Sequence, residues 1–437
     1  MKKVVVASLI LFLMLTFFTI KSIAQSASAS AYKIVAADGA WCWFSDPRAV
    51  YHKGLKKRVY YGYINSAGDV LISAMDIKTK AIQTYILHAK LQIDDHNVPA
   101  ILFLPDGKIM TFYSEHGGRF FIRKSKNAED ISAWEDERTV TFGMKEDDDL
   151  CYAHPVMLSG ENNRIYMFYR IDTGRKDGLY SSWGQYITYS DDGGMTWTKG
   201  QYYLNQKPFN NPIYMKISSD NTTRIDFVFT DGHPKIGPAS VYHMYYEKGK
   251  FYQTNGNFIA DVNHVPLQRE NINKVYDVNV TNIKSWIWDI ALDRKRRPVI
   301  TYTQYPAETD HRYHYARWNG KKWLDEELCK AGGMITVLEP GEKVEEAHYS
   351  GGVVLDHNNP SNVYLSRQVN GIFEIEHWKR KHNSWKISKI TDKSAASNLR
   401  PYVVANYPHK NPFVLWMNGL YNHYTRYKTA ILINELK

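Results

Sequence analysis

The sequence predicts an all-β fold, a seven-bladed β-propeller that forms a single domain. Strand-like runs of alternating apolar and polar residues recur from residue 41 to the C-terminus, and no long segment has helical periodicity. The chain holds 32 Tyr and 12 Trp among 437 residues, and aromatic side chains favour pleated surfaces. Seven similar units follow one another at intervals of roughly 60 residues, longer than common propeller repeats. A pair of β-sandwiches is the alternative fold.

The first 24 residues are predicted to be a secretory signal peptide. Lys2 and Lys3 precede an apolar run from Val4 to Ile20, and small residues suited to cleavage follow at Ser22–Ala24. The run is too short and wrongly flanked to span a membrane, and no later run approaches the necessary length. We therefore expect no transmembrane segment, and export to the periplasm, the cell surface or the medium.

Residues 25–38 are interpreted as a lead-in and residues 39–437 as the propeller. Each unit combines an apolar strand, a turn rich in Asp, Asn, Gly or Pro, and further strands that end in aromatic residues. The units begin, in order, at Trp41, His96, Ala153, Pro212, Trp286, His348 and Arg400. The third unit carries Ser190-x-Asp192-x-Gly194-x-Thr196-Trp197, which matches the Asp-box turn of sialidase-type propellers, a structural hairpin.

The charge favours a polyanionic partner. The formal charge is +10, and removal of the signal peptide with its three lysines leaves +7. A positive exported protein suits an acidic polysaccharide, a nucleic acid or a membrane surface. Nucleic acid is not expected, because Lys and Arg form no concentrated stripe. The three cysteines, Cys42, Cys151 and Cys329, are odd in number and include no C-x-x-C pair, which argues against a disulfide framework and a thiolate zinc site.

The start of each inner propeller strand lies near the central mouth, so residues far apart in sequence should converge there. These starts are rich in His, Tyr and Arg, which is typical of a site and not of a packed core. The converging residues are His96, Tyr152, His154, Tyr214, Trp288, Asp289, His348, Tyr349 and Arg400.

Further candidates follow from the strands themselves. His116 ends the second strand of its unit, so it should return to the neighbourhood of His96. Arg170 ends an apolar strand and needs a carboxylate partner, in the protein or in a ligand. His233 could bind a ligand or a metal, or stabilise a turn, whereas Arg48 is interpreted as a structural partner of Asp46.

Taken together, these motifs resemble the bacterial-neuraminidase-repeat propellers, and most of all the ulvan lyases of polysaccharide lyase families 24 and 25. The resemblance spans about residues 39–437. It is carried by WCWF with DPR, DDHN-x-PA, DGK, EHG, RIYMFYR, TDGHP with SVYH, HYSGG with VYLSR, and RP followed by WMNG-x-Y. It implies a seven-bladed propeller that cleaves a uronate-containing sulfated algal polysaccharide by β-elimination. The same scaffold resembles rhamnose–glucuronate lyases, an α-rhamnosidase family and a dehydratase of ulvan oligosaccharides.

The resemblance also implies roles for particular residues. His96 and His116 resemble the two catalytic histidines, Arg170 the arginine that neutralises the uronate carboxylate, and His233 a histidine that also touches a metal. Tyr152 fits best as the catalytic tyrosine, with His154 beside it. The remaining candidates for substrate contact are His154, Tyr214, His233, Tyr242, His311 and Arg400.

The expected reaction removes the C5 proton of a glucuronate or iduronate and expels the C4 oxygen. Arg170 with His116 would stabilise the carboxylate, His96 or Tyr152 would be the base, and Tyr152 would be the acid if His96 is the base. No cofactor is needed, and a bound Ca²⁺ or Zn²⁺ would be structural. The alternatives are a dehydratase or exo-lyase, a glycosidase, a non-catalytic glycan-binding propeller, and a sialidase that uses Arg48, Arg367 and Arg400. The insertions at 171–183 and 262–285 could close one end of the groove.

Overall fold

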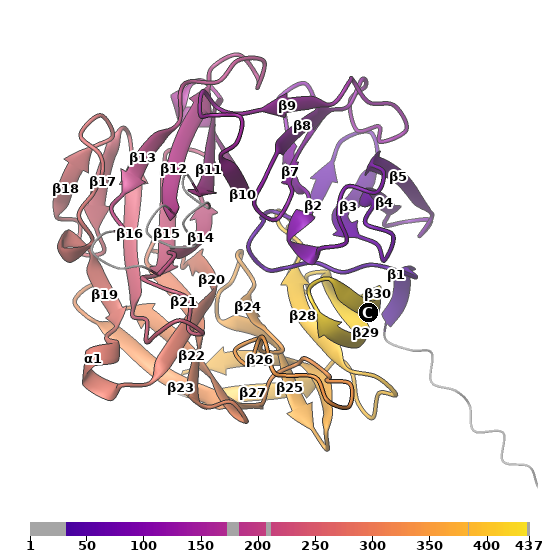
Figure 1. The fold of residues 1–437 in the computed structure, drawn as a ribbon, viewed down its shortest axis with the longest axis vertical. Coiled ribbons are helices and arrows are strands. Elements are labelled where there is room, and N and C mark those ends of the chain that lie inside the picture. The colour runs from indigo at the N-terminus through magenta and orange to yellow at the C-terminus, as the bar shows by residue number, and fades with distance from the viewer. Residues whose placement is uncertain (1–31, 173–182, 207–210, 383, 435–437) are drawn as a thin grey trace, which may run out of the picture. The chain divides into compact units, whose positions relative to one another are not determined.

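The protein is described by a computed structural model that covers residues 32–172, 183–206, 211–382 and 384–434. These residues form seven antiparallel β-sheets arranged in a ring (Figure 1). In the first sheet successive strands pair with their neighbours in the chain. The other sheets follow the same pattern except that β19 (Asn273–Tyr276) pairs with β16 (Val241–Glu247) and β1 (Tyr32–Ala36) with β30 (Arg426–Asn434). The predicted seven-bladed β-propeller is confirmed. Among the described residues, no helix has the length and apolar character needed to cross a membrane.

The first three sheets are four-stranded meanders. The first contains β2 (Ala49–Lys53), β3 (Lys57–Ile64), β4 (Val70–Asp76) and β5 (Ile82–His88). The second contains β6 (Ala100–Phe103), β7 (Ile109–Ser114), β8 (Phe120–Lys124) and β9 (Arg138–Val140). The third contains β10 (Asp149–Leu158), β11 (Arg164–Asp172), β12 (Trp183–Ser190) and β13 (Gln201–Leu204).

The fourth sheet has six strands and is the largest. It contains β14 (Tyr214–Ser219), β15 (Arg224–Thr230), β16 (Val241–Glu247), β17 (Lys250–Gln253), β18 (Phe258–Asp261) and β19 (Asn273–Tyr276). The extra strand β19 pairs with one half of β16, while β17 pairs with the other half. The predicted insertion at 262–285 thus supplies β19 and the short helix α1 (Val278–Thr281).

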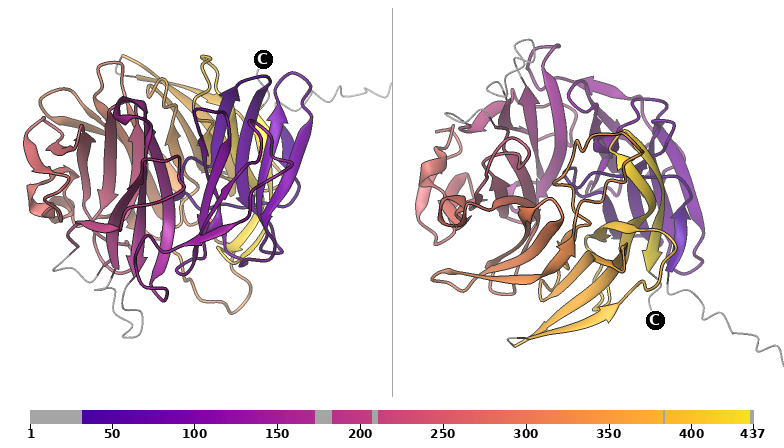
Figure 2. Two further views of the ribbon diagram at one scale, coloured as in Figure 1. Left: turned by 90° about the horizontal axis from the view of Figure 1, so that it is seen from above. Right: turned by 60° about the horizontal axis from the view of Figure 1, so that its bottom comes forward.

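The last three sheets complete the ring. The fifth contains β20 (Lys284–Leu292), β21 (Pro298–Ala307), β22 (Asp310–Trp318) and β23 (Trp323–Gly332). The sixth contains β24 (Val353–Leu355), β25 (Asn362–Val369), β26 (Ile372–Lys381) and β27 (Ser384–Lys389). The seventh contains β28 (Asn398–Val403), β29 (Val414–His423), β30 (Arg426–Asn434) and β1 (Tyr32–Ala36). Turned by 90°, the ring shows strands that run between its two faces (Figure 2).

The seventh sheet joins the two ends of the described chain. Its outer strand β1 pairs with the C-terminal strand β30, with Tyr32 opposite Asn434. The predicted lead-in of residues 25–38 therefore needs a correction, because the propeller begins at Tyr32 and not at residue 39. The predicted signal peptide, residues 1–24, lies outside the described residues.

A segment rich in aromatic residues fills the centre of the ring. Trp43 and Phe44 are almost completely buried, and the Trp43 ring stacks on Trp288 with centroids 4.6 Å apart. The Trp43 indole N–H donates a hydrogen bond to the carbonyl oxygen of Ile287 at 3.2 Å. Ile287 belongs to the inner strand β20, and Phe44 packs against Trp286 of that strand. This layer forms the floor on which the site is built.

The Asp-box motif forms the turn after β12, as predicted. One carboxylate oxygen of Asp192 accepts the backbone N–H groups of Met195 and Thr196, each at 2.9 Å. The Ser190 hydroxyl accepts the backbone N–H of Gly194 at 2.8 Å. Because these bonds satisfy the turn internally, the motif is structural.

Candidate active site

A pocket of about 350 Å³ opens where the inner strands converge. Tyr349, one of the residues expected to converge here, lines it. The six lining residues with a predicted catalytic or substrate-binding role are His96, His116, Tyr152, Arg170, Tyr214 and His233. They come from the second, third and fourth units of the sequence, and residues of the later units complete the wall. The convergence expected from propeller geometry therefore brings together the catalytic candidates.

One carboxylate holds the two candidate histidines together. Asp94 caps the short 3-10 helix η1 (Asp95–Asn97), and its Oδ1 accepts both the backbone N–H of His96 at 2.9 Å and His96 Nδ1 at 2.6 Å. Its Oδ2 accepts Nδ1 of His116, which follows β7, at 2.9 Å. An ionised carboxylate only accepts hydrogen bonds, so both rings carry a hydrogen at Nδ1. Both Nε2 atoms are therefore left for the pocket.

The charges of this group depend on one another. Burial alone would raise the pKa of Asp94, but positive charge on His96 and His116 and their hydrogen bonds bring it below its usual value. Burial, together with the neighbouring His96 charge, lowers the pKa of His116 to about 4. Two charged rings in contact would repel, so at neutral pH at least one Nε2 presents a lone pair to the pocket.

Tyr152 enters the pocket through a distortion of β10. Its backbone has φ of 61°, in the left-handed region, and the register between β10 and β11 shifts between Cys151 and His154. A bulge of this kind turns a side chain toward a new direction and is frequent beside functional sites. Burial and the neighbouring Tyr214 raise the pKa of Tyr152, although the Arg170 charge opposes them. The hydroxyl is therefore a proton donor.

Arg170 is a buried cation that forms no ion pair with a carboxylate among the described residues. It lies on β11, its side chain is only 1% exposed, and none of its three guanidinium nitrogens has a hydrogen-bond partner among the described residues. The guanidinium carbon lies 3.7 Å from the ring centroid of Trp183, 4.5 Å from Tyr152 and 4.7 Å from Tyr214. Aromatic faces hold the cation in place but do not replace a hydrogen-bonding anion. The arrangement can bind a carboxylate.

His233 presents a donor to the pocket. Its Nδ1 accepts the backbone N–H of Lys235 at 3.0 Å, so the neutral ring carries its hydrogen at Nε2. Burial lowers the pKa of His233, and the charges of His348 and Lys235 lower it further. The ring is therefore neutral, and its Nε2–H faces the cavity near Glu346.

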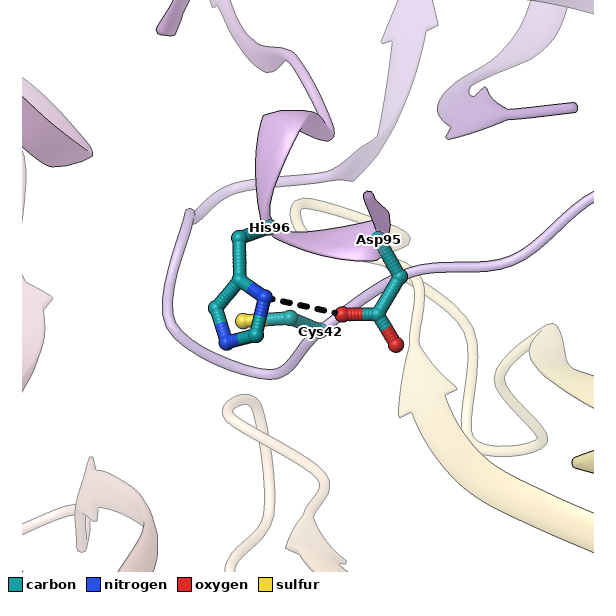
Figure 3. Close-up of side chains that lie close together, drawn as sticks. All are labelled: Cys42, Asp95 and His96. Carbon is teal, nitrogen blue, oxygen red and sulfur yellow. Dashed lines mark ion pairs between the residues drawn. The ribbon is translucent and has the colours of Figure 1, made fainter. Parts of the chain in front are cut away.

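Two groups of three donor side chains among the described residues lie close enough together to offer ligands to a metal ion. They are Cys42, Asp95 and His96 (Figure 3), and Asp94, His96 and His116. In the second group, nitrogen and oxygen lie 2.6 and 2.9 Å apart, as in hydrogen bonds, whereas two tetrahedral zinc ligands lie about 3.4 Å apart. In the first group, burial and the charge of Asp95 raise the pKa of the Cys42 thiol, and only the thiolate binds metals well. Neither group includes His233, the predicted metal ligand.

Arg400, a predicted substrate contact, is not among the residues that line the pocket and is paired within the protein. Its guanidinium is buried and forms an ion pair at 2.5 Å with Asp95, whose Oδ2 also accepts the Tyr421 hydroxyl at 2.6 Å. Two other arginines considered for a sialidase triad are likewise paired, Arg48 with Asp46 at 3.1 Å and Arg367 with Glu376 at 2.6 Å. The described residues therefore form no three-arginine site, and Arg48 has the structural role predicted for it.

Three further candidates lie away from the pocket. His154 is buried beneath it, where burial and the charge of Lys216 lower its pKa to about 3. His311 is fully buried and hydrogen-bonded through Nδ1 to the Ser350 hydroxyl at 2.9 Å. Tyr242 donates to Asp231 at 3.1 Å and lines a neighbouring cavity of about 760 Å³. None of these three predicted substrate contacts is among the residues that line the pocket.

Sequence reasoning missed several residues of the pocket. Asp94 was visible beside His96, but nothing in the sequence showed which neighbouring Asp holds the histidines. Tyr424, in the turn between β29 and β30, packs edge-on against both imidazole rings, at 5.0 Å from His96 and 5.3 Å from His116. The other missed lining residues are Trp43, Phe44, Asp172, Trp183, Pro212, Lys235, Ile236, Trp286 and Glu346.

Comparison with known proteins defines the family. The model of the BNR repeat-containing family matches residues 58–331, so the chain belongs to this family. A solved PL25 ulvan lyase bound to GlcA(1-4)Rha3S is similar with a TM-score of 0.67 and 16% identity, over 92% of this chain and 95% of the other. The polysaccharide lyase Uly1 is similar with a TM-score of 0.57 and 12% identity, over 92% of each chain. None of the curated proteins compared with the chain matches it. The resemblance to ulvan-lyase propellers is thus confirmed for the fold.

Proposed function

We propose that the pocket is the active site of a carbon–oxygen lyase that acts on a uronic acid by β-elimination across C4 and C5. The observation that carries the proposal is Arg170, a buried guanidinium that has no acceptor among the described residues and lies beside a histidine pair and a tyrosine. A uronate carboxylate supplies the missing anion. Its binding places C5 next to groups that move protons.

The proposed elimination starts at C5. The C5–H bond breaks, and an Nε2 lone pair of the His96–His116 pair takes the proton. The electron pair forms the C4–C5 double bond while the C4–O bond breaks, and the Tyr152 hydroxyl protonates the leaving oxygen. Arg170 stabilises the carboxylate as it gains negative charge, which is the role of a preorganised cation in such reactions.

The proton then returns from the histidine pair to Tyr152. The rings of His96 and Tyr152 have centroids 5.8 Å apart, and those of His116 and Tyr152 lie 6.4 Å apart. One water spans such a gap. The proposed cycle therefore takes its base, its acid and its cation from side chains alone.

The proposed substrate is an acidic, uronate-containing algal polysaccharide such as ulvan, or its oligosaccharides. Support comes from the fold shared with ulvan lyases, one of them bound to a glucuronate–rhamnose sulfate unit. The pocket shares Ile236 with the 760 Å³ cavity and Glu346 with a small cavity of about 100 Å³. Adjoining cavities suit several sugar units. Export predicted from residues 1–24 agrees with a polymeric substrate outside the cell.

The test mixes purified protein with ulvan, and separately with short uronate-ended oligosaccharides. Ultraviolet absorbance follows the conjugated double bond, and mass spectrometry follows the products. Rising absorbance with chain shortening is the expected result. Rising absorbance with loss of one water and no shortening would identify a dehydratase instead. Free sugar without absorbance, or no change with any uronate polymer, would rule out the proposal.

A further inference from the structure

His233 and Glu346 face each other across one side of the pocket. The atoms that approach are His233 Nε2 and Glu346 Oε2, and they lie 3.9 Å apart, too far for a direct hydrogen bond. The other polar atom of each side chain is already bound. His233 Nδ1 accepts the backbone N–H of Lys235, and Glu346 Oε1 accepts Lys235 Nζ at 2.9 Å.

Each residue therefore retains one polar atom for a ligand. His233 offers its Nε2–H as a donor, because Nδ1 is an acceptor in the neutral ring. Glu346 offers Oε2, which is buried and has no hydrogen-bond partner among the described residues. A buried carboxylate oxygen without a donor is unfavourable, so this atom requires an O–H or N–H group when substrate excludes water.

The gap between the two atoms has the size of one oxygen atom. An oxygen placed about 2.8 Å from both would see them at an angle of about 90°, within the range of hydroxyl geometry. That oxygen must accept from His233 and donate to Glu346. A hydroxyl does both, whereas an ether, a sulfate ester or a carboxylate oxygen has no hydrogen to donate.

We propose that His233 and Glu346 together recognise one free hydroxyl of the substrate sugar, so that the pocket rejects a sugar substituted at that oxygen. The inference rests on the proposed function, because it takes the sugar held by Arg170 as the one that presents the hydroxyl. It assigns Glu346 as a specificity-determining residue. Lys235 holds Glu346 in place through its second oxygen.

Two effects produce the selection. A deoxy sugar leaves Glu346 Oε2 without a donor, and a hydrogen bond to a charged group is worth roughly a 10- to 100-fold change in affinity. A sulfate ester adds a negative charge next to the Glu346 carboxylate, where the side chain is only 9% exposed and solvent screens little. The pocket thus accepts the uronate charge at Arg170 and excludes a second anion at Glu346.

The experiment uses synthetic trisaccharides with a central glucuronate, namely the parent compound and its 2-deoxy, 3-deoxy, 2-O-sulfo and 3-O-sulfo derivatives. Wild type and Glu346→Ala are compared by kcat/KM from ultraviolet absorbance. With the wild-type enzyme, we expect kcat/KM for one deoxy analogue to be roughly 10- to 100-fold lower than for the parent compound. For the parent compound, kcat/KM of Glu346→Ala should be lower than that of wild type by a similar factor. For that deoxy analogue, Glu346→Ala and wild type should have the same kcat/KM, because the two changes remove the same hydrogen bond.

Glu346→Gln separates charge from hydrogen bonding. Its amide oxygen still accepts the hydroxyl, but the negative charge is absent, so discrimination against the matching sulfo derivative should fall by roughly 10-fold. Glu345→Gln is the matched control, because this neighbouring carboxylate is 66% exposed and pairs with His423. It should leave all substrate ratios unchanged.

If the losses in kcat/KM from Glu346→Ala and from removal of the hydroxyl are additive for every deoxy analogue, the assignment of Glu346 is wrong, while the proposed lyase activity is unaffected. If wild type eliminates none of the compounds, the proposed function fails. Calorimetric Kd values for the same compounds then decide the inference, and the same non-additive pattern in Kd would support it. Equal Kd values for parent and deoxy compounds, or no binding of the parent, would contradict it.

Discussion

The imidazole rings of His96 and His116 lie parallel, with centroids 3.8 Å apart and planes 9° apart. They belong to different segments, yet both Nδ1 atoms bind the same carboxylate, that of Asp94. Because the rings are stacked, positive charge on His96 lowers the pKa of His116. Asp94 thus holds the two histidines as one unit, and both line the pocket.

Replacement of Asp94 by Asn should lower the rate and move the acid limb of the pH profile. The Asp94 charge raises the pKa of His116, against the burial that lowers it to about 4. Without that charge the pKa falls further, so the base stays neutral, and active, to lower pH. An amide offers one acceptor and one donor, so one ring loses its Nδ1–H and its free Nε2. We expect a loss of roughly 10²- to 10⁴-fold in kcat.

The measurement is kcat/KM against pH for wild type and Asp94→Asn. Asp192→Asn is a matched control, because Asp192 is a hydrogen-bonded carboxylate in the Asp-box turn after β12. Its acid limb should coincide with that of wild type. An unchanged acid limb in Asp94→Asn would show that Asp94 only supports the fold.

Replacement of Arg170 by Met should strongly reduce activity without lowering stability. The guanidinium has no acceptor among the described residues, and an unpaired buried charge is costly. Loss of the cation should reduce kcat/KM on a uronate substrate by roughly 10²- to 10³-fold, while the free energy of unfolding in urea stays the same or rises. Near-normal turnover would remove Arg170 from the proposed site.

Replacement of Arg400 by Met should, in contrast, lower the free energy of unfolding. Arg400 pairs with the buried Asp95, and it donates to the Tyr421 hydroxyl at 2.9 Å. Its removal leaves a buried carboxylate unpaired, which costs about 3–5 kcal/mol of unfolding free energy. Urea unfolding of the two arginine variants, side by side, checks both expectations. Equal stability of Arg400→Met and wild type would contradict the structural role.

The blades could be predicted from the sequence, because strand periodicity and turn residues are local signals. The starts of the units then located His96, Tyr152 and Tyr214 correctly, since the first strand of each blade lies innermost. The predicted start of the propeller at residue 39 was wrong, because β1 pairs with β30 and so belongs to the seventh sheet. No local sequence pattern encodes this pairing between the two ends of the described chain.

The roles of individual polar residues could not be predicted in the same way. Arg170 and Arg400 look alike in sequence, but Asp95 neutralises only Arg400. His311 was predicted to contact the substrate, but its Nδ1 is hydrogen-bonded to the hydroxyl of Ser350 in the next unit. Glu346 lies between strands, where no periodicity marks it. Each of these assignments depends on which carboxylate or hydroxyl group from another unit the fold places beside the side chain.

Replacement of Tyr152 by Phe should reduce kcat by roughly 10²- to 10⁴-fold with little effect on substrate binding. The proposed acid is then absent, but Arg170 and the histidine pair remain. A 4-deoxy-4-fluoro uronate tests the role, because fluoride leaves without protonation. We expect Tyr152→Phe to eliminate fluoride at nearly the wild-type rate. An equal defect on both substrates would show that Tyr152 is not the acid.

His154 should make the protein less stable as pH falls below 6.5. Burial and the Lys216 charge lower its folded pKa to about 3, against an unfolded value of about 6.5. Above pH 6.5 both states are neutral and the residue has no effect. Below it, the unfolded state binds a proton that the folded state refuses, so stability falls as pH falls, by roughly 1.4 kcal/mol per pH unit toward pH 3.

Urea unfolding of wild type and His154→Gln between pH 7 and 4 measures this contribution. The difference between the two free energies of unfolding should change with that slope, because every other titrating group is shared. His264→Gln, at a side chain that is 77% exposed, should follow wild type throughout. A difference between wild type and His154→Gln that is constant with pH would mean that His154 titrates alike in the folded and unfolded chain.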